Sequence, residues 1–168
     1  GVEEATRNAR SANPDAEILR ARSEITLEGG ASAQGKRVLV VEDGPTLTHG
    51  GMAWGAGYLA ARDAGVAEVV DPRDAAAPGI AAVYGQHPHI GPVLPAVGYG
   101  PAQLRALEQT IRAAGVELVI AGTPCDLGRL LDIDLPVLRA RYEYAEAESP
   151  GLAARIDGFL RSRSLIGN

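Results

Sequence analysis

The segment 38–52 constrains the fold of this chain more than any other part of its sequence. It begins with the apolar run Val-Leu-Val-Val, continues with Glu42 and Asp43, and then enters a loop of Gly, Pro, Thr and His that ends in Gly-Gly-Met. A helix-like stretch follows. A buried strand that leads through a polar, glycine-rich loop into a helix places backbone N–H groups and hydroxyls at the carboxyl end of a sheet, where open α/β sheets bind ligands. We therefore expect the chemistry of the chain at this loop.

Strand-like and helix-like segments alternate through most of the chain. The helix at 101–114 is the clearest, because Pro101 stands in its first turn and apolar residues follow at helical spacing. The alternation predicts an α/β fold, a Rossmann-like three-layer domain with a mainly parallel sheet. Helices are expected at 3–12, 51–64, 80–84, 101–114 and 152–160, and strands at 16–22, 37–42, 68–70, 92–97, 117–121 and 136–142.

Composition excludes several classes of protein. The chain has 168 residues, of which 46% are hydrophobic and 22% are charged, as in a globular domain with a substantial core. Its net charge of −5 argues against general nucleic-acid binding. No apolar run is long enough to cross a membrane. The single cysteine, Cys125, fits a reducing compartment, so we expect a cytoplasmic protein. From the charge and the lack of a long apolar run, we expect it to bind neither nucleic acid nor membrane.

The loop after Val41 supplies the candidate catalytic residues Glu42, Asp43 and His49. Carboxylates there could hold a metal ion or orient a hydroxyl, and the imidazole adds a donor. The alternative is a strand-to-helix turn in which threonines cap the following helix. Residues expected to bind the substrate in this loop are Thr46, Thr48, Gly50 and Gly51, the glycines because they allow an anionic group to approach the backbone.

Polar side chains also follow the next predicted strands. Arg73 could clamp a phosphate or carboxylate, or only pair with Asp71. His89 could orient a substrate or be a plain solvated histidine. Together with His87 it lacks a third ligand in register for zinc, so we assign no metal ligand in the chain. Tyr99 either contacts a ligand or covers the sheet edge.

The last two predicted strands add four more candidates for substrate binding. Thr123 and Asp126 follow a buried strand and could either cap a helix or meet the ligand. Arg139 and Arg141 alternate along the final strand and point to one face, so this strand lies at an edge or the pair meets an anion. We expect the loops that follow the predicted strands to converge at one rim of the sheet.

Two absences shape the expected domain organisation. The chain has no Gly-x-x-x-x-Gly-Lys-Ser/Thr sequence, so it cannot build a P-loop nucleotide site alone. Its only methionine is Met52, which indicates a processed chain, an engineered piece or a fragment. Of these we favour a fragment.

Several segments of the sequence carry motifs that occur together in one protein family. These are residues 36–52, 55–58, 70–73, 88–95, 98–100, 122–127 and 139–142. In these segments the chain resembles the C-terminal part of the cyclic 2,3-diphosphoglycerate synthetase family, which includes archaeal and bacterial P-loop proteins labelled as GTPases. The resemblance covers about residues 2–144. It implies that residues 1–34 are the end of a P-loop nucleotide-binding domain, that 35–145 form the Rossmann-like domain, and that 146–168 hold a terminal helix.

The resemblance also implies a reaction. The full-length enzyme would be a ligase that uses ATP and Mg²⁺ to close 2,3-diphosphoglycerate into its cyclic pyrophosphate, with the ATP site mostly outside this chain. The partners would be a small phosphorylated substrate, the missing N-terminal P-loop region and a second copy in a homodimer. We expect the isolated chain to be inactive. The alternatives are a GTPase-like member without cyclic product, and a non-catalytic binding or dimerisation module.

Overall fold

The computed structural model describes residues 1–163 and divides into two compact units. Unit 1 comprises residues 1–24 together with the chain from 143 onward, and unit 2 comprises residues 25–142. The domain boundaries expected at 34/35 and 145/146 stay predictions. Because the buried core lies in unit 2, this unit positions the candidate site.

The sheet has six strands, and each pairing that involves β2 or β5 is parallel. The order is β1-β6-β5-β2-β3, and β4 pairs with β2. Every residue of β5, and all but the ends of β2, are buried, as expected for strands covered on both faces. The strands are β1 Ala21–Leu27, β2 Arg37–Asp43, β3 Glu68–Val69, β4 Leu94–Ala96, β5 Leu118–Gly122 and β6 Val137–Glu146. This confirms the predicted α/β fold with a mainly parallel sheet.

The order in which strands are added to the sheet reverses between β2 and β5, although all of these strands are parallel. β5 pairs along one side of β2, so β3 and β4 share its other side: β3 lies against its first residues and β4 against its last. The chain therefore leaves β2 toward β3 and later returns from β4 across β2 to β5. Ligands of open α/β sheets bind at such a switch point, outside the carboxyl ends of the strands.

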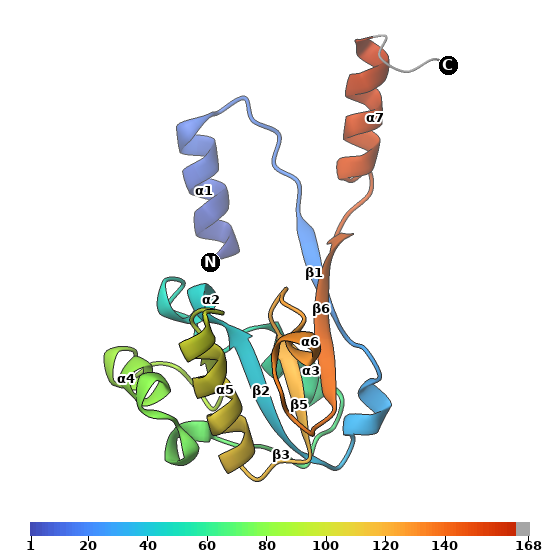
Figure 1. Ribbon diagram of the computed structural model, residues 1–168. Coiled ribbons are helices and arrows are strands. Elements are labelled where there is room, and N and C mark those ends of the chain that lie inside the picture. The colour runs from blue at the N-terminus through green and yellow to red at the C-terminus, as the bar shows by residue number, and fades with distance from the viewer. Residues whose placement is uncertain (164–168) are drawn as a thin grey trace. The chain divides into compact units, whose positions relative to one another are not determined.

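Two helices cover opposite faces of this sheet. Figure 1 shows α5 next to β2 on the near side of the sheet, with α3 behind β5. The apolar face of α5 buries Leu107 and Ile111, and the small residues Gly57, Ala60 and Ala61 let α3 approach its face closely. The helical segments of unit 2 are η1 Gly30–Ala33, α2 Gly44–Thr48, α3 Ala56–Asp63, η2 Pro72–Ala75, α4 Pro78–Gln86, α5 Pro101–Ala113 and α6 Leu127–Leu130.

Two predicted elements differ from the structure. The helix expected at 51–64 is wrong at its start, because the chain forms the short α2 first and begins α3 only at Ala56. Gly51 between them has a φ of +64°, which breaks the helical path. The strand expected at 16–22 instead spans Ala21–Leu27, since its position is fixed by pairing with β6 and not by local sequence.

Unit 1 contains α1 Val2–Ala12 and α7 Leu152–Ser162, together with the first part of β1 and the last part of β6. Neither helix has a buried residue. Arg155 pairs with Glu17 at 2.7 Å, and the backbone N–H of Ala147 donates to the carbonyl of Arg20 at 3.3 Å. Within residues 1–163, no helix has the length and apolar character required to cross a membrane.

Candidate functional site

The candidate site is the carboxyl rim of unit 2, which we define as the last residues of β2, β4 and β5 and the segments that follow them. Glu42 on β2 is in register with Gly122 on β5 and with Pro95 on β4, so these three strands end side by side. The expected convergence is therefore correct for them. It is wrong for β3, which ends opposite Val38 near the start of β2 and stops short of the rim.

Glu42 is buried at the rim and only 1% exposed. Its Oε1 accepts hydrogen bonds from the backbone N–H groups of Gly55, at 3.0 Å, and Tyr58, at 2.8 Å, at the start of α3. Burial raises the pKa of Glu42 to about 7, although the N–H groups of Tyr58, Gly55 and Gly57 oppose that shift. The carboxyl thus occupies the helix N-terminus at which an anionic ligand would otherwise bind.

Glycines make room for this buried carboxyl. A Cβ on Gly122 would lie 2.2 Å from Glu42 Oε2 and 2.8 Å from the backbone nitrogen of Gly57, and a Cβ on Gly55 would lie 2.6 Å from the same Oε2. These glycines are thus required for packing between β5, β2 and α3. The catalytic role assigned to Glu42 stays a prediction; as it lies here, its side chain contacts backbone and not solvent.

Asp43 is the carboxylate that faces the rim. It is half-buried and precedes α2, but its side chain does not cap that helix. In the described part of the chain it has no hydrogen bond or ion pair, although its charge helps to raise the pKa of Tyr99. A carboxylate at a switch point with no internal partner is able to bind a cationic or hydrogen-bond-donating group of a ligand.

Hydroxyl groups from the segments after β4 and β5 meet at the rim. Tyr99 Oη lies 2.6 Å from Thr123 Oγ1, and the backbone N–H of Cys125 donates to the same Thr123 oxygen at 3.3 Å. Burial raises the pKa of Tyr99 to about 12, with a hydrogen bond to Thr123 acting in the opposite direction. The phenol is therefore neutral at physiological pH. The sequence left two roles open for Tyr99, a ligand contact or a cover over the sheet edge, because its pairing with Thr123 across 24 residues is not visible in the sequence.

The predicted substrate-binding residue Arg73 lies on η2, after the short β3. Its guanidinium pairs with Asp71 at 2.7 Å, donates to the carbonyls of Ile90 and Gly91, and stacks over the ring of Tyr84 at 4.6 Å. These contacts hold the segment that leads into β4. Since all of them lie within the chain, the structure gives Arg73 a positioning role, and its contact with a substrate stays a prediction.

The histidines of the segment after Asp43 and of the segment before β4 lie together. His49 Nδ1 is 3.0 Å from Thr48 Oγ1, and His89 Nε2 donates to the carbonyl of Leu47 at 2.9 Å. Thr46 has no side-chain hydrogen bond among the described residues. Gly50 is required by packing, because a Cβ there would lie 2.5 Å from the carbonyl oxygen of Thr46.

The remaining predicted residues lie on and after β5 and β6. Asp126 pairs with Arg129 at 3.6 Å at the surface. Arg139 donates to the carbonyl of Pro124 at 3.2 Å, so it supports the loop after β5. Arg141 pairs with Glu28. The sequence offered an edge strand or a bound anion as explanations for the two arginines on β6. The edge strand is wrong, because β6 lies between β1 and β5, and both arginines have partners inside the chain.

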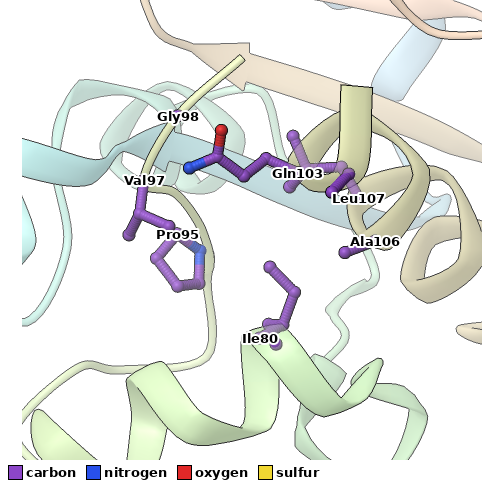
Figure 2. A pocket seen from close by; sticks show the side chains of 9 residues that line it. Ile80, Pro95, Val97, Gly98, Gln103, Ala106 and Leu107 are labelled. Atoms are coloured by element: carbon purple, nitrogen blue, oxygen red, sulfur yellow. The ribbon is translucent and has the colours of Figure 1, made fainter. Parts of the chain in front are cut away.

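Two cavities open beside the end of β4. One, of about 330 Å³, is lined by Thr48, His49 and His87 among others. The other, of about 260 Å³, is mainly apolar and lies between α4, α5 and the end of β4. Figure 2 shows Ile80, Pro95 and Leu107 around it, with the Gln103 amide extending toward Gly98. Among residues 1–163, no group of three or more His, Cys, Asp or Glu side chains is placed to hold a metal ion.

The chain was compared with known proteins. It is 45% identical over 151 residues to an arginine synthetase, ArcE, from Thermococcus kodakarensis. The match covers 90% of this chain but only 34% of that protein, so the chain spans about a third of the length of this relative. No protein-family model matches the chain, and no solved structure matches it.

This similarity overturns the resemblance to the cyclic 2,3-diphosphoglycerate synthetase family and the cyclising reaction drawn from it, because the relative is named for a different product. The motifs that carried the resemblance, such as Glu42 to Gly51, describe a strand-to-helix turn at the carboxyl rim. Within that motif, Glu42 is held by backbone N–H groups of α3, Gly44 packs against the carbonyl of Ala96 and Gly50 against the carbonyl of Thr46, so these three residues have structural roles that involve no substrate. A turn of this kind positions a ligand but does not specify which one.

Proposed function

We propose that this chain is a segment of an ATP-dependent ligase of the arginine synthetase kind, and that its carboxyl rim contacts the amino acid. The observation that carries the proposal is the 45% identity over 151 residues to the synthetase from Thermococcus kodakarensis. A synthetase whose product is arginine must hold a guanidinium group at the end of the reaction.

The rim has groups that suit such a ligand. Asp43 has no internal ion pair, and a guanidinium forms two parallel hydrogen bonds with one carboxylate. The hydroxyl groups of Tyr99 and Thr123 lie at the same rim, where the charge of Asp43 acts on Tyr99, and they can bind further polar atoms. The buried Glu42 behind them holds α3 in place.

We further propose that ATP and Mg²⁺ bind mainly to residues outside this chain. The chain contains no Walker sequence, and Glu42 already occupies the N-terminus of α3. In this proposal the chain positions the amino acid, and residues contributed from elsewhere activate it.

The test is an arginine-formation assay on the full-length natural protein. It is incubated with ATP, Mg²⁺, ammonium and amino acids that lack one guanidinium nitrogen, and arginine is quantified by chromatography. We expect ATP-dependent arginine formation, and a loss of about tenfold or more in kcat/KM in Asp43→Asn, since one charge-assisted hydrogen bond contributes about 1.5–3 kcal/mol.

The matched control is Asp134→Asn. Asp134 is an exposed carboxylate that precedes β6. It therefore lies toward the amino ends of the parallel strands, opposite the carboxyl rim. Its replacement should leave kcat/KM unchanged. A wild-type protein that forms no arginine with any of these precursors would refute the proposed reaction, and equal losses in both variants would refute the proposed rim.

A further inference from the structure

Two of the three histidines of the chain line one cavity, and the third lies next to one of them. His49 follows α2 and His87 ends α4, and both line the cavity of about 330 Å³. The ring of His89 lies edge-on to that of His87, with 5.9 Å between centroids. In the part of the chain that the structure describes, no Asp, Glu, Lys or Arg side chain lines this cavity.

The walls of the cavity are fixed to each other. His89 Nε2 donates to the carbonyl of Leu47 at 2.9 Å and so ties the segment after α4 to α2. Gly44 packs directly against the end of β4, since a Cβ on it would lie 2.6 Å from the carbonyl oxygen of Ala96. The cavity is therefore formed before any ligand binds, which lowers the entropic cost of binding.

Hydrogen bonds define the tautomer of His49. Thr48 Oγ1 donates its single proton to the carbonyl of Gly44 at 3.0 Å, and the same oxygen lies 3.0 Å from His49 Nδ1. Nδ1 must therefore carry a hydrogen and donate it to Thr48. In the neutral ring Nε2 then has no proton, and it becomes a donor only when the ring takes up a second proton.

The apolar cavity lies immediately beside the histidines, because Val97 lines both. Ile80, Pro95 and Leu107 form its apolar surface, and Gln103 is its polar side chain (Figure 2). An apolar surface with one or two convergent polar groups is typical of small-molecule sites. The two cavities together offer an uncharged part and a part that can become cationic.

We propose that the two cavities form one subsite for a small organic anion. Its anionic group, a phosphate monoester or a carboxylate, lies between His49 and His87, and its uncharged body fills the apolar cavity. Because His49 must carry protons on both nitrogens to donate to an anion, binding takes up a proton. This inference does not depend on the proposed ligase reaction.

The groups that could modify this charge are few. The titratable side chains on the elements around His49 are His87 and His89 from the α4 side and Asp43 and the buried Glu42 from β2. An anion bound between the imidazoles favours their protonated, cationic form, so the affinity for an anion should rise as the pH falls.

The experiment is calorimetric titration of this chain at pH 6 and pH 8 with six probes. AMP and hexanoate carry both an anion and a body, adenosine and hexanamide carry only the body, and inorganic phosphate and acetate carry only the anion. We expect AMP or hexanoate to bind at least tenfold more tightly than its two parts, and about tenfold more tightly at pH 6 than at pH 8. Which of the two binds identifies the source of the anion.

Variants separate the two parts of the subsite. His49→Gln and His87→Gln should each weaken the binding of the complete probe about tenfold. Ala102→Leu places a larger side chain in the apolar cavity from an exposed position. It should weaken the binding of the complete probe without changing the binding of phosphate or acetate. The control is Arg129→Gln, which removes a surface cation that lines neither cavity and should have no effect. A complete probe that binds no better than its parts, or whose affinity is the same at both pH values or in His49→Gln, would overturn the proposal.

Discussion

Units 1 and 2 have similar kinds of elements but reach stability by different means. In unit 2, the central strands and the helices that cover them bury a continuous apolar core. In unit 1, α1 and α7 have amphipathic sequences and yet bury no residue, so that Ile156 and Phe159 are 47% and 56% exposed. Helices of 11 residues without tertiary packing are marginal in water. The stability of the fold, and with it the position of the rim, therefore depends on the core of unit 2.

Truncation of a core side chain should have the largest effect. Leu39 on β2 is fully buried, and we expect Leu39→Ala to lower the free energy of unfolding by about 2–5 kcal/mol, because it removes buried apolar surface and leaves a cavity. Urea unfolding followed by circular dichroism measures this. A loss below about 1 kcal/mol would contradict the assignment of the core to unit 2.

The pH dependence of stability should be the next largest effect. Folding raises the pKa of Glu42 from 4.5 to about 7, so between these values the folded state binds more protons than the unfolded state. The stability contribution of Glu42 is therefore complete below pH 4.5 and decreases as the pH rises to about 7, by about 3 kcal/mol in total.

The control for this prediction is Glu42→Gln, which cannot titrate. Urea unfolding at several pH values should show a shallower decline between pH 4.5 and 7 in the variant than in the parent chain. Identical pH profiles would show that Glu42 is not the buried acid that we describe.

A methyl group added at the rim should have an intermediate effect. In Gly122→Ala the new Cβ would meet Glu42 Oε2 and the backbone of Gly57, and we expect a loss of about 1–3 kcal/mol from overpacking. Gly79→Ala on α4 is the matched control, since nothing lies within 4 Å of its Cβ and alanine favours a helix. Thermal unfolding of both variants distinguishes a packing requirement from a general preference for glycine; equal stability would remove the packing argument.

The smallest effect should come from unit 1. Because Ile156 is 47% exposed on α7, Ile156→Ala should change the free energy of unfolding by less than about 0.5 kcal/mol. This is the same type of truncation as Leu39→Ala, measured in the same way. A loss comparable to that of Leu39→Ala would show that α7 is covered in solution and that the two units do not differ as described.

The elements that the sequence predicts well are those determined locally. The helix at 101–114 is specified by Pro101 in its first turn, by apolar residues at helical spacing and by Gly115, and α5 follows it within one residue. The position of β1 was missed because pairing with β6, more than 100 residues away, decides it. The start of α3 was missed because Glu42 accepts hydrogen bonds from its first turn, an interaction across the intervening loop.

For the candidate site as well, the features that follow from local sequence were predicted and those that depend on long-range contacts were not. Asp43 and Thr123 were placed correctly at one rim, because strand ends and parallel pairing can be inferred from the alternation of segments. The pair of Arg73 with Asp71, one of the two alternatives from the sequence, is present. The other partners were not predictable, since each lies far along the chain: Ile90 for Arg73, Leu47 for His89 and Glu28 for Arg141. Backbone carbonyls in particular leave no trace in a sequence pattern.

The most direct test of the central claim, that the carboxyl rim of unit 2 is the ligand surface, is a ¹H–¹⁵N correlation spectrum of this chain titrated with L-arginine. The account predicts concentration-dependent shifts of the amides of Gly44, Gly100 and Thr123, which lie on or next to the rim, with no shifts in α1 or α7. These shifts should disappear in Asp43→Asn and persist in Asp134→Asn. Shifts confined to unit 1, or an unchanged response in Asp43→Asn, would contradict it.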